Sequence, residues 1–430
     1  MLDISLIREN PEIIKKDLEK RNALDKIELL KQIRKKDDEW RNLKVQVDEL
    51  RHQRNNISIE ISKIKKEGGD ASAKLKEALQ IPKMIQEKED FANVLRKEID
   101  AALMQLPNIL HSSVPIGSDE AHNKVVRKFG KKPKFTFKPR DHVDLLQSLF
   151  QADLERAAKI SGARFWFLRD KIAQLDLALQ KYAADFMVKK GFTLIQPPYM
   201  MNRQVYEGVT DLNDFENVMY KIENENLYLI ATSEHPLVGM FYDEMLSAEC
   251  LPIRLVGISA CFRKEAGTHG KDEKGIFRGH QFNKVEQVIL CRPDDSWKLH
   301  EELIKNAEDF FKALGLHCRT VSVCTGDIGA VAAKKYDIEC WMPAQDTYRE
   351  VVSCSNCTDY QARRLKIRYK ANDNAKGFAH TLNSTCVATS RAIVGILENY
   401  QNKDGSVTIP KVLVPYMNGL KKIEAVKAKK

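Results

Sequence analysis

The first hundred residues carry apolar side chains at alternating spacings of three and four, a pattern that predicts the seam of a coiled coil. Between 33 and 64, eight of the ten seam positions are apolar, and the spacing resumes after Gly68, Gly69 and Asp70 and continues to Leu106. Pro82 lies within the second segment, where we expect it to kink the helix or delay its start because its ring removes a backbone donor. The pattern predicts two antiparallel helices joined by a tight turn, over about residues 28–105.

The residues after 107 mix two kinds of apolar pattern. Residues 144–161 and 171–190 have the periodicity of amphipathic helices. Short β-branched runs follow with few helices between them, and such strands pair antiparallel more readily than parallel. We predict an α+β fold in which an antiparallel sheet flanked by helices (111–430) follows an N-terminal domain (1–110) that contains the helical arm. The predicted strands are 192–200, 226–232, 253–262, 282–291, 318–324 and 337–343.

Composition narrows the class of protein. The 430 residues are 43% hydrophobic and 30% charged, which excludes a disordered chain. No apolar run approaches the roughly 20 residues of a membrane helix, and the N-terminus resembles no targeting signal, so we expect a cytoplasmic protein without a membrane contact. Nine cysteines, an odd number, predict reduced thiols. The net charge of +10 favours a polyanionic partner, and the 12 basic against 7 acidic residues of 26–66 fit either a solvated coiled-coil surface or a nucleic-acid surface.

Residues 261–290 form the segment richest in chemical groups, two strand-like runs joined by a charged, Gly-containing loop. Arg263 and Glu265 share one strand face, as do Phe282, Lys284 and Glu286, because alternate residues point the same way. A guanidinium suits a phosphate, a phenyl ring suits a base, and a carboxylate suits an ammonium group. The set predicts a site for an aminoacyl-nucleotide, although an exposed hairpin with ordinary ion pairs would show the same spacing.

Three segments resemble the signature motifs of class II aminoacyl-tRNA synthetases. Residues 261–290 resemble motif 2, GFTLIQPPYM resembles motif 1 with Pro198 at a dimer interface, and HTLNSTCVATSRAIVGILENY resembles motif 3. Within that class the chain is similar to seryl-tRNA synthetases of the archaeal and eukaryotic branch, through its N-terminal opening, LPNILHSSVPIG, ATSEHP and REVVSCSNCTDYQARR. Motif 3 departs from its Gly-rich form at Ser384, Cys386 and Ser390.

The resemblance implies a homodimeric serine-tRNA ligase. Such an enzyme activates L-serine with ATP to seryl-adenylate and pyrophosphate, and then transfers serine to the 3′-terminal adenosine of tRNA(Ser); whether tRNA(Sec) is also charged stays open. The N-terminal domain would bind the tRNA. A related protein that only binds nucleic acid, a ligase acting on a carrier protein and a threonine enzyme are the alternatives. Retained Arg263, Glu286 and Arg391 argue against the first, the long arm against the second, and the missing zinc motif against the third.

The same resemblance implies the roles of individual residues. Catalysis falls to Arg263, Glu286 and Arg391. Serine would be bound by Thr232, Glu234, Arg263, Glu286, Asn383 and Thr385, and the choice between Asn383 and Thr385 as the hydroxyl contact stays open. ATP would be bound by Arg263, Lys264, Glu265, Gly279, His280, Gln281, Phe282, Glu350, Val351, Val352, Ser353 and Arg391.

Magnesium is the metal that the resemblance implies. Glu350 and Ser353 would hold Mg²⁺ together with the ATP phosphates. Cys354 and Cys357 form a C-x-x-C pair, but no second pair accompanies them, whereas tetrahedral zinc needs four ligands or three plus water. Zinc is therefore not expected, and two buried thiols are the preferred interpretation.

Overall fold

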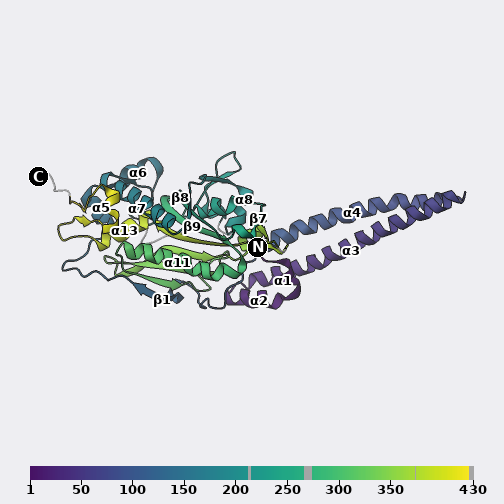
Figure 1. Cartoon of the computed structure of the whole chain (residues 1–430), viewed down its shortest axis with the longest axis horizontal. Coiled ribbons are helices and arrows are strands. Elements are labelled where there is room, and N and C mark those ends of the chain that lie inside the picture. The colour runs from purple at the N-terminus through teal and green to yellow at the C-terminus, as the bar shows by residue number, and fades with distance from the viewer. Residues whose placement is uncertain (212–214, 266–273, 373, 426–430) are drawn as a thin grey trace. The chain divides into compact units, whose positions relative to one another are not determined.

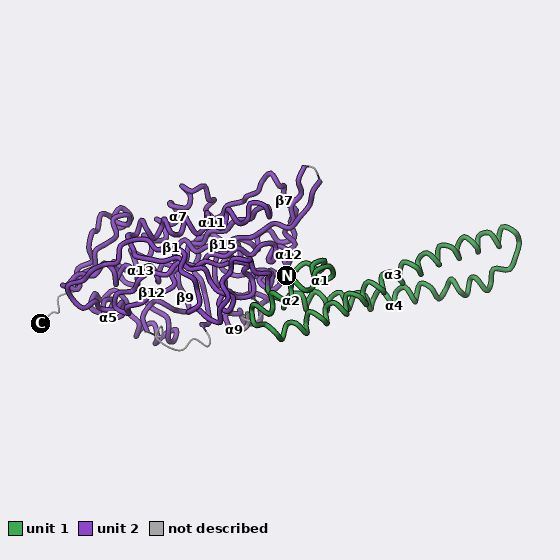
Figure 2. The backbone as a smooth tube through the Cα atoms, turned by 90° about the horizontal axis from the view of Figure 1, so that it is seen from below, with its two compact units in different colours: residues 1–107 green, residues 108–430 purple. Residues whose placement is uncertain are grey.

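The chain forms two compact units, residues 1–107 and residues 108–430 (Figure 2). The computed structural model describes residues 1–211, 215–265, 274–372 and 374–425. None of the described helices is both long and apolar enough to cross a membrane.

The N-terminal unit is a helical hairpin preceded by two short helices, α1 (Ile4–Glu9) and α2 (Pro11–Lys20). The hairpin consists of α3 (Asp25–Lys66) and α4 (Ser72–Leu103), and the 42 residues of α3 span roughly 60 Å at 1.5 Å per residue (Figure 1). Pro82 does not delay α4, which begins ten residues earlier. Ile81 and Ile85 beside it pack against α3, so tertiary packing outweighs the unfavourable propensity of the proline.

One charged residue interrupts the apolar face of α3. The side chain of Asp37 is only 2% exposed, and both of its oxygens accept hydrogen bonds from Arg8 of α1 at 2.7 Å. Arg41 lies 3.2 Å from the same carboxylate. This partly buried ion pair, in which only the carboxylate is fully enclosed, attaches α1 to the base of the hairpin.

The C-terminal unit is built on an eight-stranded sheet of order β1-β10-β11-β12-β15-β9-β8-β4. Every neighbouring pair is antiparallel except β4 with β8 at one edge. The predicted α+β fold with an antiparallel sheet is therefore confirmed. The strands are β1 (Lys124–Phe129), β4 (Thr193–Ile195), β8 (Ile253–Phe262), β9 (Gln281–Cys291), β10 (Cys318–Ser322), β11 (Lys334–Met342), β12 (Thr347–Asn356) and β15 (His380–Ala388).

Helices cover one face of this sheet. Apolar side chains of α5 (His142–Leu149), α7 (Asp170–Lys189), α11 (Ser296–Ala313) and α13 (Thr389–Asn399) join one core cluster with the strands. A second cluster packs α8 (Arg203–Val209), α10 (Glu234–Gly239) and α12 (Tyr360–Leu365) against other residues of β8 and β9. The helices of the first cluster thus cover the central strands on one face, and those of the second cover part of the other face.

The predicted single helix over 144–161 is wrong. Phe150 adopts a left-handed conformation that ends α5, and Asp153 accepts a hydrogen bond from the backbone of Arg156 to start α6 (Leu154–Ser161). Two separate helices result. The smaller elements are β2 (Ala152–Asp153), β3 (Phe167–Leu168), β5 (Met200–Asn202), α9 (Phe215–Val218), β6 (Leu227–Leu229), β7 (Met245–Ser247), β13 (Arg368–Lys370), β14 (Lys376–Phe378), β16 (Val407–Thr408) and β17 (Lys422–Ile423).

The cysteines are not all reduced. Cys318 and Cys340 stand opposite each other on β10 and β11 and form a disulfide. The expectation of reduced thiols is wrong for this pair, because pairing of distant sequence segments, which spacing does not reveal, brings the sulfurs together. The other seven cysteines are free.

Replacing Arg8 with alanine should destabilise the N-terminal unit, because Asp37 would keep a buried charge with Arg41 as its remaining partner. We expect a loss of about 1–3 kcal/mol in the free energy of unfolding. Chemical denaturation followed by circular dichroism measures it. Lys31→Ala, which removes the exposed pair with Glu28, is the control and should cost no more than about 0.5 kcal/mol. Equal effects of the two substitutions would contradict the role of the buried pair.

Candidate active site

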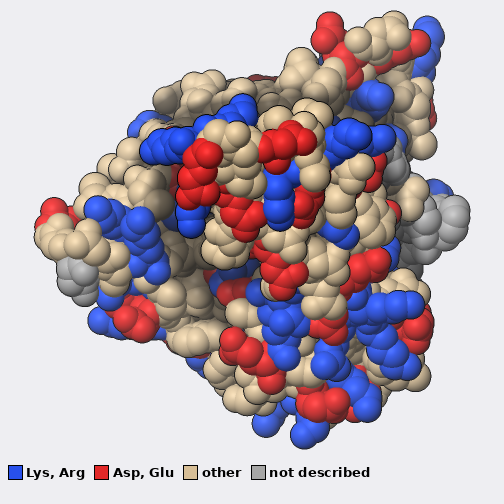
Figure 3. Space-filling view, turned by 90° about the vertical axis from the view of Figure 1, so that its right-hand side faces the viewer, with Lys and Arg blue, Asp and Glu red and all other residues tan. Residues whose placement is uncertain are grey.

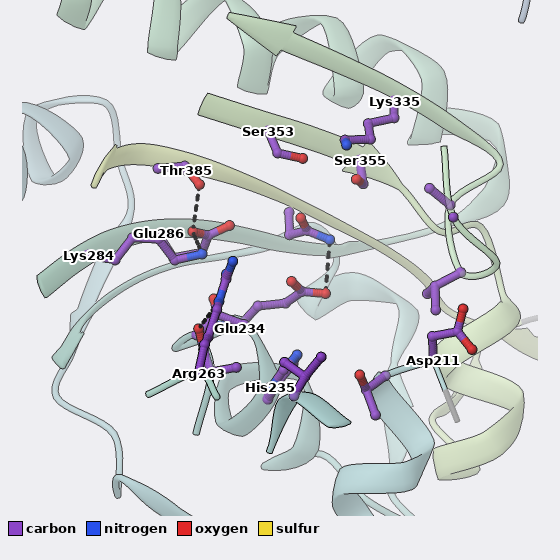
Figure 4. A pocket seen from close by; sticks show the side chains of 18 of the residues that line it. Asp211, Glu234, His235, Arg263, Lys284, Glu286, Lys335, Ser353, Ser355 and Thr385 are labelled. Atoms are coloured by element: carbon purple, nitrogen blue, oxygen red, sulfur yellow. Dashed lines mark hydrogen bonds and ion pairs between the residues drawn. The ribbon is translucent and has the colours of Figure 1, made fainter. Parts of the chain in front are cut away.

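A cavity of about 480 Å³ opens on the partly covered face of the sheet (Figure 4). Its walls come from the strands β9, β15, β12 and β11, from α10 and α13, and from Arg263, which follows β8 (Ile253–Phe262). Acidic and basic side chains are concentrated there. The charged residues that line it are Asp211, Glu234, Arg263, Arg278, Lys284, Glu286, Lys335, Glu350 and Arg391.

Glu286 lies at the centre of β9, and its side chain is 2% exposed. Nζ of Lys284, two residues earlier on the same face, lies 2.6 Å from Oε2 of Glu286. The hydroxyl of Thr385 donates to the same oxygen at 3.1 Å from the neighbouring strand β15 (Figure 4). One cation and one hydroxyl thus balance a carboxylate that burial alone would penalise.

Glu234, at the start of α10, points into the same cavity (Figure 4). Its Oε1 accepts hydrogen bonds of 3.0 Å from Gln361 Nε2 and from Asn383 Nδ2. Burial, together with the charge of Glu286, raises the pKa of Glu234 to about 7. The hydroxyl of Thr232 accepts from the Glu234 backbone amide at 3.2 Å, which fixes the loop before the helix.

A bulge in β12 orients the predicted metal and phosphate ligands. Ile338 pairs with Val352 but Glu339 pairs with Glu350, so Val351 is an extra residue. Without it, Glu350 and Ser353 would point to opposite faces, because their spacing is odd. With it, both line the cavity together with Val351, while Val352 lies in the apolar core.

A second bulge has the same effect in β15. Thr385 pairs with Glu286 and Val387 pairs with Val285, which leaves Cys386 as the extra residue. Asn383 and Thr385 share the cavity face through ordinary alternation, and the bulge keeps Ala388, three residues after Thr385, on that face as well. The helix α13 begins directly after the strand. The first turn of this helix carries Arg391 to the cavity wall.

Arg391 and Glu350 form an ion pair across the cavity wall. Nη1 of Arg391 donates to the Glu350 carboxylate at 2.9 Å and to its backbone carbonyl at 3.1 Å. Desolvation alone would raise the pKa of Glu350, but Arg391, Lys335 and Arg263 outweigh it and lower the pKa below its usual value. Glu350 therefore stays ionised beside three cations.

Arg263 follows directly after β8 and faces the return strand. Its guanidinium carbon lies 5.3 Å from the centre of the Phe282 ring, and its Nε donates to the carbonyl of Ala231 at 3.4 Å. Both side chains line the cavity, which places a phosphate-binding group beside a flat ring. Residues 266–273 of the loop that joins the two strands lie outside the described residues.

The other predicted ATP contacts do not line this cavity. The backbone amide of Lys264 donates to Val218, and Glu265 accepts from Arg278 at 3.0 Å. His280 forms a hydrogen bond of 2.8 Å with the Tyr220 hydroxyl. Gln281 and Trp166 both line a separate pocket, and Trp166 also packs closely on Gly279. These residues support the hairpin around Arg263 and Phe282.

Several residues that line or support the cavity have no role assigned from the sequence. Lys284 shares the predicted strand face of Glu286, and this alternation is the signal that points to a role for it. Lys335 and His235 carried no signal, since their positions depend on strand pairing and on a helix start. Gln361 is fully buried, donates to Glu234 and accepts from Thr381 at 2.6 Å, so it positions Glu234 from behind.

The described residues contain no group of three or more His, Cys, Asp or Glu side chains able to hold a metal ion by themselves. Glu350 and Ser353 offer two oxygen donors on one cavity wall, which suits the way Mg²⁺ binds through one or two protein ligands plus phosphate oxygens. Cys354 and Cys357 are buried, free thiols, and burial raises the pKa of Cys354.

Comparison with known proteins identifies the class first. A class II tRNA synthetase core domain model (G, H, P, S and T) matches residues 218–400, which contain most of the cavity. A prolyl-tRNA synthetase of Giardia lamblia, 15% identical, has a TM-score of 0.56 over 63% of this chain and 54% of its own, which shows the shared fold. The sheet and its cavity therefore define a class II aminoacyl-tRNA synthetase core.

The particular family follows from both units. A seryl-tRNA synthetase N-terminal domain model matches residues 1–110. The serine–tRNA ligase of Methanocella arvoryzae is 54% identical over 98% of this chain and 99% of its own length. A crystal structure of seryl-tRNA synthetase from Pyrococcus horikoshii complexed with ATP matches with a TM-score of 0.97 and 52% identity over 99% of this chain and all of that chain. The chain belongs to the seryl-tRNA synthetase family.

A eukaryotic relative extends the same match. A crystal structure of a cytoplasmic serine–tRNA ligase from Naegleria fowleri in complex with AMP is 36% identical, with a TM-score of 0.90 over 99% of both chains. The predicted archaeal and eukaryotic resemblance is confirmed.

The raised pKa of Glu234 leads to a prediction about pH. Below about pH 7 this carboxylate takes up a proton and loses the charge that attracts an ammonium group, so KM for serine should rise about tenfold between pH 8 and pH 6. Glu234→Gln should have a high KM that varies little over this range. Steady-state pyrophosphate exchange measures both. The control is Glu302→Gln, on the surface of α11, which should keep the wild-type profile. A pH profile unchanged by Glu234→Gln would contradict this role.

Proposed function

We propose that this protein activates L-serine with ATP to form seryl-adenylate and pyrophosphate, and then transfers serine to the 3′-terminal adenosine of tRNA(Ser). The observation that carries the proposal is that one cavity holds two largely buried carboxylates, Glu234 and Glu286, together with Arg263 and Arg391. We call the surroundings of the two carboxylates the acidic part, and the surroundings of the two arginines the cationic part. The carboxylates suit the ammonium group of an amino acid, and the arginines suit the phosphates of a nucleotide triphosphate. The ATP-bound relative, 52% identical with a TM-score of 0.97, supports the nucleotide assignment.

Serine would lie in the acidic part. Its ammonium group is the cation that balances Glu234 and Glu286, with Thr232 shaping the loop. Asn383 and Thr385 both line this part and both retain acceptor oxygens, so either can receive the serine hydroxyl. A pocket that bonds this hydroxyl rejects alanine, since its polar groups would otherwise stay unpaired.

ATP would lie along the cationic part. Phe282 stacks on the base, Arg263 binds the α-phosphate and the serine carboxylate, and Arg391 binds the γ-phosphate. Glu265, Lys264, Val352 and residues 279–281 then act by shaping the hairpin and strand around the nucleotide. Mg²⁺, held by Glu350 and Ser353 with the phosphates, supplies charge neutralisation when bound.

The chemistry needs positioning more than a protein base. A carboxylate oxygen of serine attacks the α-phosphorus and pyrophosphate leaves, while the Arg263 guanidinium stabilises negative charge on the phosphoryl oxygens. In the second step a ribose hydroxyl of the tRNA attacks the adenylate carbonyl and AMP leaves. Holding both reactants in one cavity supplies most of the rate enhancement.

The other parts of the proposal are the tRNA partner, the oligomeric state and the cellular location of the protein. The N-terminal unit would grip the backbone of tRNA(Ser), and the protein would act as a homodimer through its motif 1 segment near Pro198, in the cytoplasm. Charging of tRNA(Sec) is a further substrate assignment that follows if the arm recognises a long variable arm. The relatives at 52–54% identity that carry the name serine–tRNA ligase support the tRNA assignment.

Serine-dependent exchange of labelled pyrophosphate into ATP, without tRNA, tests the first half-reaction. We expect exchange with serine and at least about 100-fold less with alanine, threonine or glycine, because only serine fits both the size and the hydroxyl contacts. Arg263→Ala should abolish it. Absence of exchange with every amino acid in folded protein that still binds tRNA would favour a protein that only binds nucleic acid.

The same assay separates the two units. A variant in which a short Gly-Ser linker replaces residues 28–103 should keep exchange, since no described cavity residue lies there, and should lose most tRNA charging. Unchanged charging by this variant would contradict the role of the arm.

A further inference from the structure

The densest positive charge of the chain lies outside the helical arm. Residues 124–140 contain eight Lys or Arg and no Asp or Glu, and thus carry +8 against +10 for the whole chain. Residues 1–107, by contrast, have 23 basic and 21 acidic residues. On the face shown in Figure 3, basic and acidic side chains are intermixed. We call residues 124–140 the basic strip.

The charges of the basic strip are exposed and largely unbalanced. It comprises β1, an edge strand of the large sheet, and the segment that follows it. Arg127 pairs with Glu308 at 2.6 Å, and Nζ of Lys132 lies 3.3 Å from the centre of the Trp341 ring. Five further exposed lysines form no ion pair with a described carboxylate: Lys124, Lys128, Lys131, Lys134 and Lys138.

Strand pairing places part of this strip on the same face of the sheet as the cavity. Lys128 pairs with Arg319, whose neighbour Thr320 bonds Glu308 of the helix-covered face, so Lys128 and Arg319 point to the other face. The ammonium group of Lys132 contacts the Trp341 ring. Trp341 lies on the same face of β11 as Lys335, which lines the cavity, because an even number of positions separates them. Lys128 and Lys132 therefore lie on the same face of the sheet as the cavity.

The need to prevent an edge strand from pairing with other chains explains only some of the lysines in the basic strip. Lysines on an edge strand discourage pairing with other chains, which accounts for Lys124 and Lys128. Lys131, Lys134 and Lys138 lie beyond the end of β1, where there is no strand edge to protect. A membrane surface is a poor match, because membrane-surface segments are amphipathic helices and the strip is a strand and a loop.

We propose that the basic strip binds the phosphate backbone of the tRNA whose 3′ end enters the cavity. This inference rests on the proposed function and adds a second RNA-binding surface, on the catalytic unit. A run of unpaired lysines suits a polyanion of regular charge spacing and carries no base specificity. Binding there therefore contributes affinity and orientation, whereas identity is read elsewhere.

The test compares two full-length variants with equal loss of charge. In the strip variant Lys128, Lys131, Lys134 and Lys138 become glutamine; in the control variant Lys298, Lys403, Lys411 and Lys421, exposed lysines outside the strip, become glutamine. Binding of unmodified tRNA(Ser) transcript is measured from 50 to 300 mM KCl, together with KM for tRNA and serine-dependent pyrophosphate exchange.

We expect the strip variant to raise KM for tRNA about tenfold and to reduce the slope of log K against log salt by at least about 2, with exchange unchanged. The control variant should match the wild type in all three measurements. Equal tRNA binding by both variants would overturn the proposal. Absence of exchange in the wild type would instead refute the proposed function.

Discussion

Two carboxylates buried in one cavity are the constraint on which the site depends. Glu234 and Glu286 lie in one cavity and are both largely buried, and a buried carboxylate is costly without nearby cations and hydrogen-bond donors. Lys284 and Thr385 supply these to Glu286, while Gln361 and Asn383 supply them to Glu234. An ammonium group completes the balance, so the free cavity is already matched to an amino acid.

The sheet meets this constraint through paired strands and two bulges. Glu286 and Thr385 stand opposite each other on β9 and β15, so their contact follows from the register. The bulges at Val351 and Cys386 break the regular alternation of the strands, so the residues before and after each bulge point to opposite faces. Glu350 and Ser353 therefore both reach the cavity, while Val352 lies in the core. The rigid centre of the sheet thus fixes groups that would be imprecise on loops.

Much of this architecture could be predicted, and the failures have physical causes. The spacing of apolar residues along the arm is a local pattern, so the helical hairpin can be predicted from the sequence. The alternation of residues 282, 284 and 286 is local too, and it predicts the shared face of Phe282 and Glu286. The bulges, the opposition of Cys318 and Cys340, and the contact of Arg8 with Asp37 depend on pairing between distant segments. The division of 144–161 into two helices depends on one residue, Phe150, in a left-handed conformation.

The central claim is that the cavity recognises serine by its hydroxyl as well as its ammonium group. Calorimetric titration of the full-length protein with the sulfamoyl analogue of seryl-adenylate, and with its alanyl counterpart, tests it directly. The account predicts that the seryl compound binds at least about 100-fold more tightly, because the alanyl compound leaves buried polar groups unpaired. Equal affinities would contradict the account.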